Sequence, residues 1–139
     1  MHVLFVCTGN TCRSPMAAAL LKQKNKEITV SSAGLFVPVA SPASEYAVLA
    51  MQKKGIDLSA HLARQLTPEI AASADVILTM TQRHKDMILQ MAPEARERVY
   101  TLGEYAGEDT EVPDPFGGDA ALYQKCADVL SDLIERMPL

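Results

Sequence analysis

The sequence has no long apolar run, no excess of basic residues and no even set of cysteines. Its 139 residues carry a formal net charge of −4 and three cysteines. The acidic balance gives no support to nucleic-acid binding, which favours a basic patch. The apolar run near the N-terminus is too short for a signal or membrane segment, so no membrane partner is expected. The odd cysteine count differs from the paired framework of secreted domains and predicts a reduced, cytoplasmic setting.

Repeats and low-complexity segments are also absent, and the length suits a single hydrophobic core. We therefore expect one domain over residues 1–139. Because the net charge is small and negative, affinity for anions has to come from a local arrangement of donors rather than from the global field.

The segment Cys7–Pro15 is the most informative part of the chain. It follows the apolar run Val3–Val6, and five residues separate Cys7 from Arg13. A buried strand, a loop and a helix start in this order direct backbone N–H groups at one point, which makes an anion site. The Arg13 guanidinium adds a planar fork for two phosphate oxygens. The pattern predicts a phosphate cradle with a nucleophilic thiolate at its base.

The same spacing also arises by chance, and a lone buried cysteine is usually a small core residue. Here, however, Gly9 and Asn10 suit tight or left-handed backbone. Ser14 and Pro15 match the N-cap and first-turn preferences of a helix, which is predicted to start at Ser14. The complete strand–loop–helix context favours the catalytic interpretation.

Buried strands alternate with helices along the chain. The predicted strands are Val3–Val6, Ile28–Ala33, Asp75–Met80 and Arg98–Leu102, and the predicted helices are Ser14–Lys26, Ala43–Lys54, Thr81–Met91 and Asp119–Met137. This alternation predicts an α/β layer fold with a parallel sheet and helices on both faces. Ligands of such sheets bind beyond the carboxyl ends of the strands, where Cys7 lies.

The segment Cys7–Pro15 resembles the signature loop of the low-molecular-weight protein tyrosine phosphatases. The resemblance covers nearly the full chain in the family's order, through Ser32–Gly34, Gly55–Leu66, Ala74–Met80 and Asp114–Gly118. It implies a three-layer α/β/α sandwich whose four-stranded parallel sheet has the order 2-1-3-4. It also implies a cysteine-dependent protein phosphatase that acts on phosphorylated proteins, and we expect a monomer.

Phosphoryl transfer to sulfur requires a nucleophile, neutralisation of charge and protonation of the leaving atom. We expect Cys7 to form a thiophosphate intermediate while Arg13 and the loop N–H groups hold the phosphate oxygens. Because these donors already meet the phosphate charge, no metal or cofactor is expected. The loop residues expected to bind or support the substrate are Thr8, Gly9, Asn10, Thr11, Cys12 and Ser14.

Within this loop, two side chains have expected supporting contacts. The resemblance implies that the Ser14 hydroxyl donates to the Cys7 sulfur, which favours its charged form. The Asn10 side chain is expected to hold the shape of the loop through hydrogen bonds to neighbouring backbone.

An aspartate between two prolines, such as Asp114, is more often a turn former than a catalyst. The resemblance instead makes Asp114 the general acid, because the family's acid stands in this Asp-Pro-aromatic context. It would protonate the leaving atom and then accept a proton from water. Phe116 is expected to form an apolar wall beside the substrate, or alternatively to anchor the loop in the core.

Thr11 bears on which phosphorylated side chain is accepted. Many tyrosine-specific members have an apolar residue there, whereas the octet Cys7–Ser14 and the ending Asp114–Gly118 resemble the bacterial protein arginine phosphatases. Phosphoarginine has N–H donors near phosphorus, and the Thr11 hydroxyl can accept a hydrogen bond from them. Leaving them unpaired would cost about 1–3 kcal/mol. We predict phosphoarginine as the substrate, with phosphotyrosine as the alternative.

Two other functions use a similar loop. Arsenate reductases need further cysteines in the second half of the chain, where only Cys126 is present. A non-catalytic anion-binding module would not need Cys7, Arg13 and Asp114 together. Both functions are therefore disfavoured.

The remaining cysteines and histidines have simpler interpretations. Cys12 is a candidate for a small packed residue and for a partner that joins Cys7 on oxidation and protects it, and the two roles are compatible. Cys126 is expected in the core. His61 is predicted to be a structural hydrogen-bonding residue, and His84 is predicted to lie on a solvated helix face.

Overall fold

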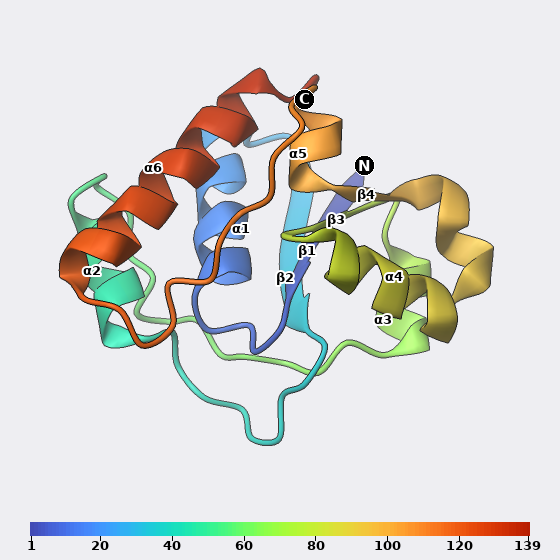
Figure 1. The fold of residues 1–139 in the computed structure, drawn as a ribbon, viewed down its shortest axis with the longest axis horizontal. Coiled ribbons are helices and arrows are strands. Elements are labelled where there is room, and N and C mark those ends of the chain that lie inside the picture. The colour runs from blue at the N-terminus through green and yellow to red at the C-terminus, as the bar shows by residue number, and fades with distance from the viewer.

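A four-stranded parallel sheet forms the centre of the computed structural model, which describes residues 1–139 (Figure 1). The strand order is β2-β1-β3-β4, as the resemblance implies. The central strand β1 has five buried residues out of six, which fits its continuous apolar sequence. The strands are β1 (His2–Cys7), β2 (Thr29–Gly34), β3 (Val76–Thr79) and β4 (Val99–Thr101).

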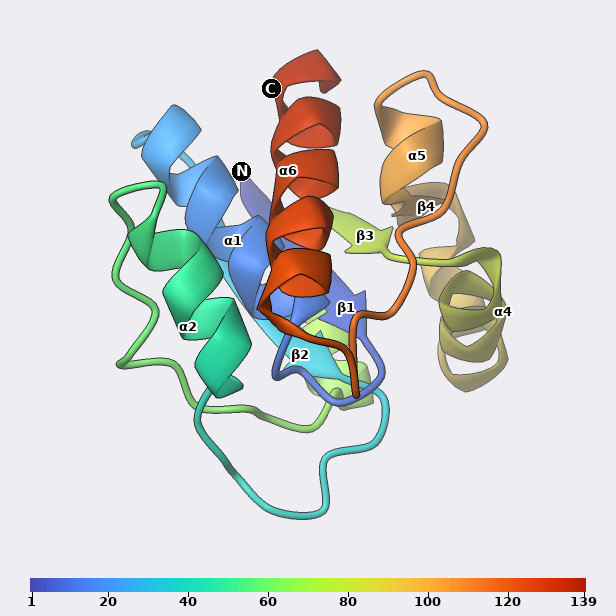
Figure 2. The same ribbon diagram turned by 60° about the vertical axis from the view of Figure 1, so that its left-hand side comes forward.

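Helices cover both faces of the sheet (Figures 1 and 2). On one face lie α1 (Arg13–Lys24), α2 (Glu45–Gln52) and α6 (Ala120–Arg136), and on the other α3 (Pro68–Ser73) and α4 (Gln82–Met91). The expected α/β sandwich is therefore confirmed. None of the helices combines the length and apolar character needed to cross a bilayer.

The core has one part on each face of the sheet, because alternate residues of β1 point in opposite directions. Val3 and Phe5 belong to the larger buried cluster, which includes Leu21 of α1 and Leu130 of α6. Leu4 belongs to the smaller cluster, which α3 and α4 cover. Burial on both sides fixes the register of β1 and so the position at which Cys7 leaves the sheet.

The predicted elements are all present with ends that move by one or two residues, but two short α-helices and one 3-10 helix were not predicted. Helix α3 begins at Pro68 behind the N-cap Thr67. Helix α5 (Leu102–Tyr105) directly follows β4, because Thr101 and Glu104 form a reciprocal capping box. A 3-10 helix over Pro93–Arg98 precedes β4.

The start of α1 corrects one prediction. The sequence predicts Ser14 as the N-cap, but the helix begins at Arg13, and Cys12 stands at the N-cap with no side-chain hydrogen bond to the helix. The first N–H groups of α1 are thus not capped by a side chain, as an anion site requires. The Ser14 side chain is used elsewhere, against Cys7.

Candidate active site

Cys7 is the last residue of β1 and lines a pocket of about 560 Å³ at the carboxyl edge of the sheet. Eight of the ten predicted site residues line this pocket, and the other two, Asn10 and Ser14, are buried behind it. Phe36 and Pro38 complete the lining and were missed by the sequence analysis. The predicted residues in the lining are Cys7, Thr8, Gly9, Thr11, Cys12, Arg13, Asp114 and Phe116.

Asn10 fixes the shape of the loop between β1 and α1. It is the one non-glycine residue with a positive φ, at 57°. Its Nδ2 donates to Ser14 Oγ at 2.7 Å and to Ser32 Oγ at 3.0 Å, and its Oδ1 accepts from Arg64 N at 3.0 Å. His61 Nε2 donates to the Asn10 carbonyl at 2.7 Å, so the predicted structural role of His61 is confirmed.

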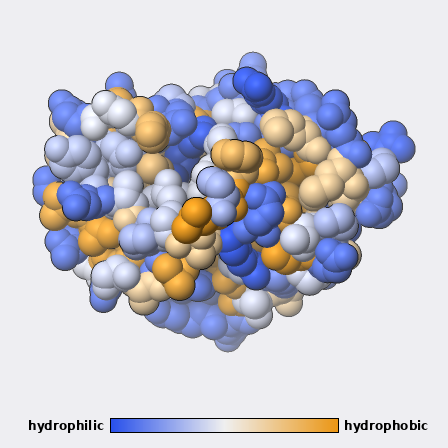
Figure 3. Space-filling view, turned by 90° about the horizontal axis from the view of Figure 1, so that it is seen from below, coloured by the Kyte–Doolittle hydropathy of each residue, from blue (hydrophilic) through white to orange (hydrophobic).

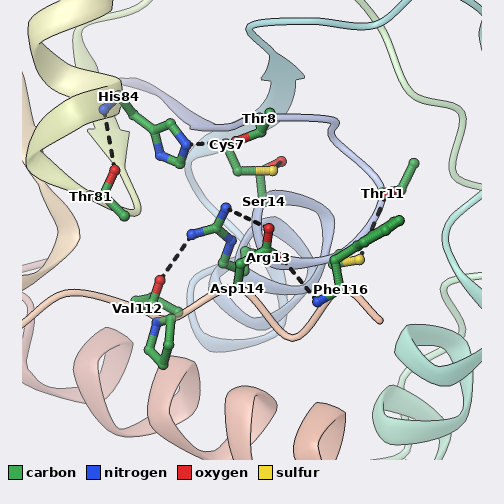
Figure 4. A network of polar contacts seen from close by, with 12 residues as sticks. Cys7, Thr8, Thr11, Arg13, Ser14, Thr81, His84, Val112, Asp114 and Phe116 are labelled. Carbon is green, nitrogen blue, oxygen red and sulfur yellow. Dashed lines mark hydrogen bonds and ion pairs between the residues drawn. The ribbon is translucent and has the colours of Figure 1, made fainter. Parts of the chain in front are cut away.

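The Cys7 sulfur is buried and lies 2.9 Å from Ser14 Oγ (Figure 4). Because Asn10 already donates to Ser14 Oγ, the hydroxyl hydrogen of Ser14 is free to point at the sulfur. A hydrogen bond in that direction favours a negatively charged sulfur. The contact expected between Ser14 and Cys7 is therefore present.

Arg13 connects the loop between β1 and α1, residues 8–12, which we call the phosphate loop, to the segment that carries Asp114. Its side chain is buried, Nη1 donates to Val112 O at 2.9 Å, and Nη2 lies 3.7 Å from Asp114 Oδ2 (Figure 4). Holding the guanidinium in place before substrate binds lowers the entropic cost of gripping a phosphate.

Asp114 makes the backbone contact of a turn former and also faces Arg13. Its Oδ1 accepts from the backbone N–H of Phe116 at 3.0 Å, the hydrogen bond of a turn former, while Oδ2 faces Arg13. Half of the side chain is exposed at the pocket. Phe116 lines the pocket, and because it is 73% exposed the alternative of a core anchor is wrong.

His84 contradicts the sequence-based prediction of a solvated helix face. Its side chain is buried, and Nε2 lies 2.9 Å from Thr8 Oγ1 in the phosphate loop. Burial and then the positive charge of Arg13 lower its pKa to about 4, so the ring is neutral at pH 7. The signal for this position was its spacing from Ile88, since residues four apart share a helix face.

The other two cysteines are also buried and free. Cys12 Sγ lies 3.5 Å from both Ser44 Oγ and Tyr123 Oη. Burial raises the pKa of Cys126 to about 12, which makes it an inert core thiol as expected.

Comparison with known proteins identifies a family and relatives. Residues 2–137 match the family described as low molecular weight phosphotyrosine protein phosphatase. The protein-arginine-phosphatase of Geobacillus stearothermophilus is 46% identical, with 98% of this chain and 93% of the relative covered. The low molecular weight protein-tyrosine-phosphatase Ptp of Acinetobacter johnsonii is 40% identical, with 89% of this chain and 86% of the relative covered.

A solved structure shares the fold of this chain. A mutant of YwlE arginine phosphatase with a phosphorylated active-site serine superposes with a TM-score of 0.93 at 41% identity. The superposition covers 98% of this chain and 92% of that one.

The buried neutral His84 predicts a loss of stability in mild acid. The unfolded chain binds the proton near the ordinary pKa of 6.5 and the folded protein only near 4. The neutral ring therefore contributes stability that is fully present above pH 6.5 and is lost as the pH falls towards 4. Between pH 7 and pH 4.5 the free energy of unfolding should fall by about 2 kcal/mol more in the native protein than in His84→Gln.

Urea unfolding of both proteins at the two pH values measures this difference. Glutamine can still hydrogen-bond Thr8 but does not titrate, so the variant corrects for all other groups. An equal loss of stability in the two proteins would show that His84 is not held neutral by the fold.

Proposed function

Because this chain belongs to the low molecular weight phosphotyrosine protein phosphatase family, and is a protein phosphatase, we propose that Cys7, Arg13 and Asp114 carry out its reaction on phosphoarginine in proteins. The main support is the arrangement of one pocket, with a buried sulfur at its floor, a hydroxyl beside it and a carboxyl at its rim. The relative in Geobacillus stearothermophilus is a protein-arginine-phosphatase, which supports the same substrate.

In the first step the Cys7 sulfur attacks phosphorus, and a phosphorus–sulfur bond forms. The bond from phosphorus to the guanidine nitrogen breaks, and its electron pair stays on that nitrogen, which takes a proton from the Asp114 carboxyl. Arg13 and the N–H groups at the start of α1 hold the equatorial oxygens throughout. The products are a thiophosphate on Cys7 and an unmodified arginine.

In the second step water attacks the thiophosphate. Asp114, now a carboxylate, accepts the proton from this water, and the bond from phosphorus to sulfur breaks. Inorganic phosphate leaves, and the Cys7 thiolate is restored. The Ser14 hydroxyl, 2.9 Å from the sulfur, stabilises that leaving charge.

Thr11 is the residue proposed to select phosphoarginine. Its side chain lines the pocket, and its hydroxyl makes only a 3.7 Å contact with Cys12 Sγ. It is therefore available to accept a hydrogen bond from the guanidine N–H groups of the substrate. A substrate without such donors leaves the hydroxyl unpaired on binding.

Phosphotyrosine is the second candidate substrate. Phe36 and Phe116, both exposed, line the same pocket and offer aromatic contacts to a phenyl ring. The relative in Acinetobacter johnsonii is a protein-tyrosine-phosphatase. A direct comparison of the two substrates is therefore needed.

We also propose that residues 1–139 act as one domain and as a monomer in the cytoplasm, without nucleic-acid or membrane partners. The support is the net charge of −4 and the presence of three free thiols.

Replacement of Thr11 tests the proposed substrate. In Thr11→Ile the ratio of kcat/KM for phosphoarginine peptides to that for phosphotyrosine peptides should fall by about ten- to a hundredfold, because the guanidine donors lose their acceptor. Phosphate release from matched peptides gives both values. Thr11→Ser keeps the hydroxyl and should keep the ratio within a few-fold. A native enzyme that prefers phosphotyrosine would overturn the assignment.

Oxidation is a second test of this loop, because we propose that Cys12 protects Cys7. Peroxide would oxidise the Cys7 thiolate to a sulfenic acid, and the Cys12 thiol would then displace water to form a disulfide. Treated native enzyme should regain its activity with dithiothreitol. In Cys12→Ser no thiol captures the sulfenic acid, so further peroxide should oxidise it to a sulfinic acid, which dithiothreitol does not reduce, and the activity should be lost permanently. Peptide mass spectrometry that finds no link between Cys7 and Cys12 in inactivated enzyme would exclude this protection.

A further inference from the structure

A second pocket, of about 580 Å³, adjoins the catalytic pocket on the side of α4. We call it the flank pocket. The two pockets share Thr8, Arg13, Phe36 and Asp114, so a molecule bound in one continues directly into the other. None of the catalytic steps above uses the remaining lining of the flank pocket.

Hydrogen bonds hold the walls of the flank pocket together. We call residues 111–118, which carry Asp114, the acid loop. Val112 N of this loop donates to the carbonyl of Met80, directly after β3, at 3.0 Å, and Glu111 accepts from Gln82 N of α4 at 2.7 Å. His84 ties α4 to the phosphate loop. The pocket is therefore formed before any ligand binds, which lowers the cost of binding.

The lining of the flank pocket suits an apolar side chain. Leu35, Phe36, Met87 and Pro113 form its apolar part, and Phe36 and Met87 are 69% and 43% exposed. Figure 3, which views the carboxyl edge of the sheet, shows hydrophobic surface extending to the right of centre, the side on which α4 lies in Figure 1. Covering such surface is favourable by about 25 cal/mol per Å².

Charged side chains in the flank pocket balance one another. Arg13 and Asp114 take part in the proposed reaction, and the other charged residues of the lining, Arg83 and Glu111, are opposite in sign. A charged residue of a ligand would gain little from this field, and desolvating it would be costly. The balance favours a neutral, apolar occupant.

We propose that the flank pocket binds an apolar side chain of the substrate protein that neighbours the phosphorylated residue. The inference rests on the proposed function, because a side chain that reaches Cys7 has to leave the catalytic pocket across its rim. Phe36 and Asp114 form that rim and also the rim of the flank pocket. Consecutive Cα atoms are about 3.8 Å apart, so a residue adjacent to the phosphorylated one is close enough to reach over this shared rim. Met87 is then a specificity-determining residue.

Met87→Gln tests the proposal, because glutamine keeps the length of methionine and removes its apolar character. The substrates are phosphopeptides in which the residues flanking the phosphorylated one are all leucine or all glycine, prepared with phosphoarginine and with phosphotyrosine. The native enzyme should have a kcat/KM about tenfold higher for the leucine peptide, and Met87→Gln should reduce that preference at least threefold. Met91→Gln, one turn further along α4 and outside the pocket, is the matched control and should retain it.

Hydrolysis of p-nitrophenyl phosphate separates this proposal from the proposed function. This small substrate has no flanking residues, so its kcat/KM should be equal in the native enzyme and both variants. If only phosphotyrosine peptides are hydrolysed, the substrate assignment fails, while the leucine preference is still measured in that series. Equal kcat/KM values of the native enzyme for the leucine and glycine peptides would overturn the proposed role of the flank pocket. So would a leucine preference that Met87→Gln leaves intact. A leucine preference that falls equally in Met91→Gln would also overturn that role.

Discussion

Asn10 holds the phosphate loop in a left-handed turn, and the positions of the catalytic groups depend on the four hydrogen bonds that it makes. These bonds join the loop to α1, to β2 and to the segment around Arg64. Each buried polar group left unpaired would cost about 1–3 kcal/mol, so the turn is held against its own strain. The loop also requires a residue without a side chain at Gly34, which lies against it. A Cβ at Gly34 would lie 2.9 Å from Thr8 O and 3.0 Å from Asn10 Cβ.

The phosphate loop holds its polar groups in fixed positions because it joins two rigid elements, β1 and α1. Burial on both sides fixes β1 and with it Cys7, and α1 presents its uncapped start and Arg13 at the same point. The hydrogen bond from Arg13 to the Val112 carbonyl then holds the acid loop against the phosphate loop. The nucleophile, the phosphate donors and the proposed acid are thus held by one continuous set of contacts, which is the preorganisation that phosphoryl transfer requires.

The catalytic loop was predictable from the sequence because its signal is local. Strand, loop and helix start follow one another within Val3–Pro15, and each residue type has a reason to stand where it does. Alternation of strands and helices also predicted the parallel sheet. It did not determine the strand order, since right-handed crossovers allow several orders, and the resemblance to a known family supplied it.

What the sequence left out depends on packing between distant segments. His84 is 76 residues from Thr8, and its burial follows from the way α4 lies against the phosphate loop. The charged neighbours Arg83 and Lys85 favoured the wrong prediction that His84 is exposed to solvent. Phe36 and Met87 likewise acquire a shared role only when the segment after β2, α4 and the acid loop meet around the flank pocket.

The central claim is that the Cys7 sulfur carries the phosphoryl group between the two steps. The direct measurement mixes Asp114→Asn with an aryl phosphate, whose good leaving group needs little acid assistance, and quenches the reaction in alkali. The account predicts one phosphoryl group bonded to sulfur, seen by phosphorus NMR and located on the Cys7 peptide by mass spectrometry, and none in Cys7→Ala. Turnover without that adduct, or a phosphoryl group on another residue, would contradict it.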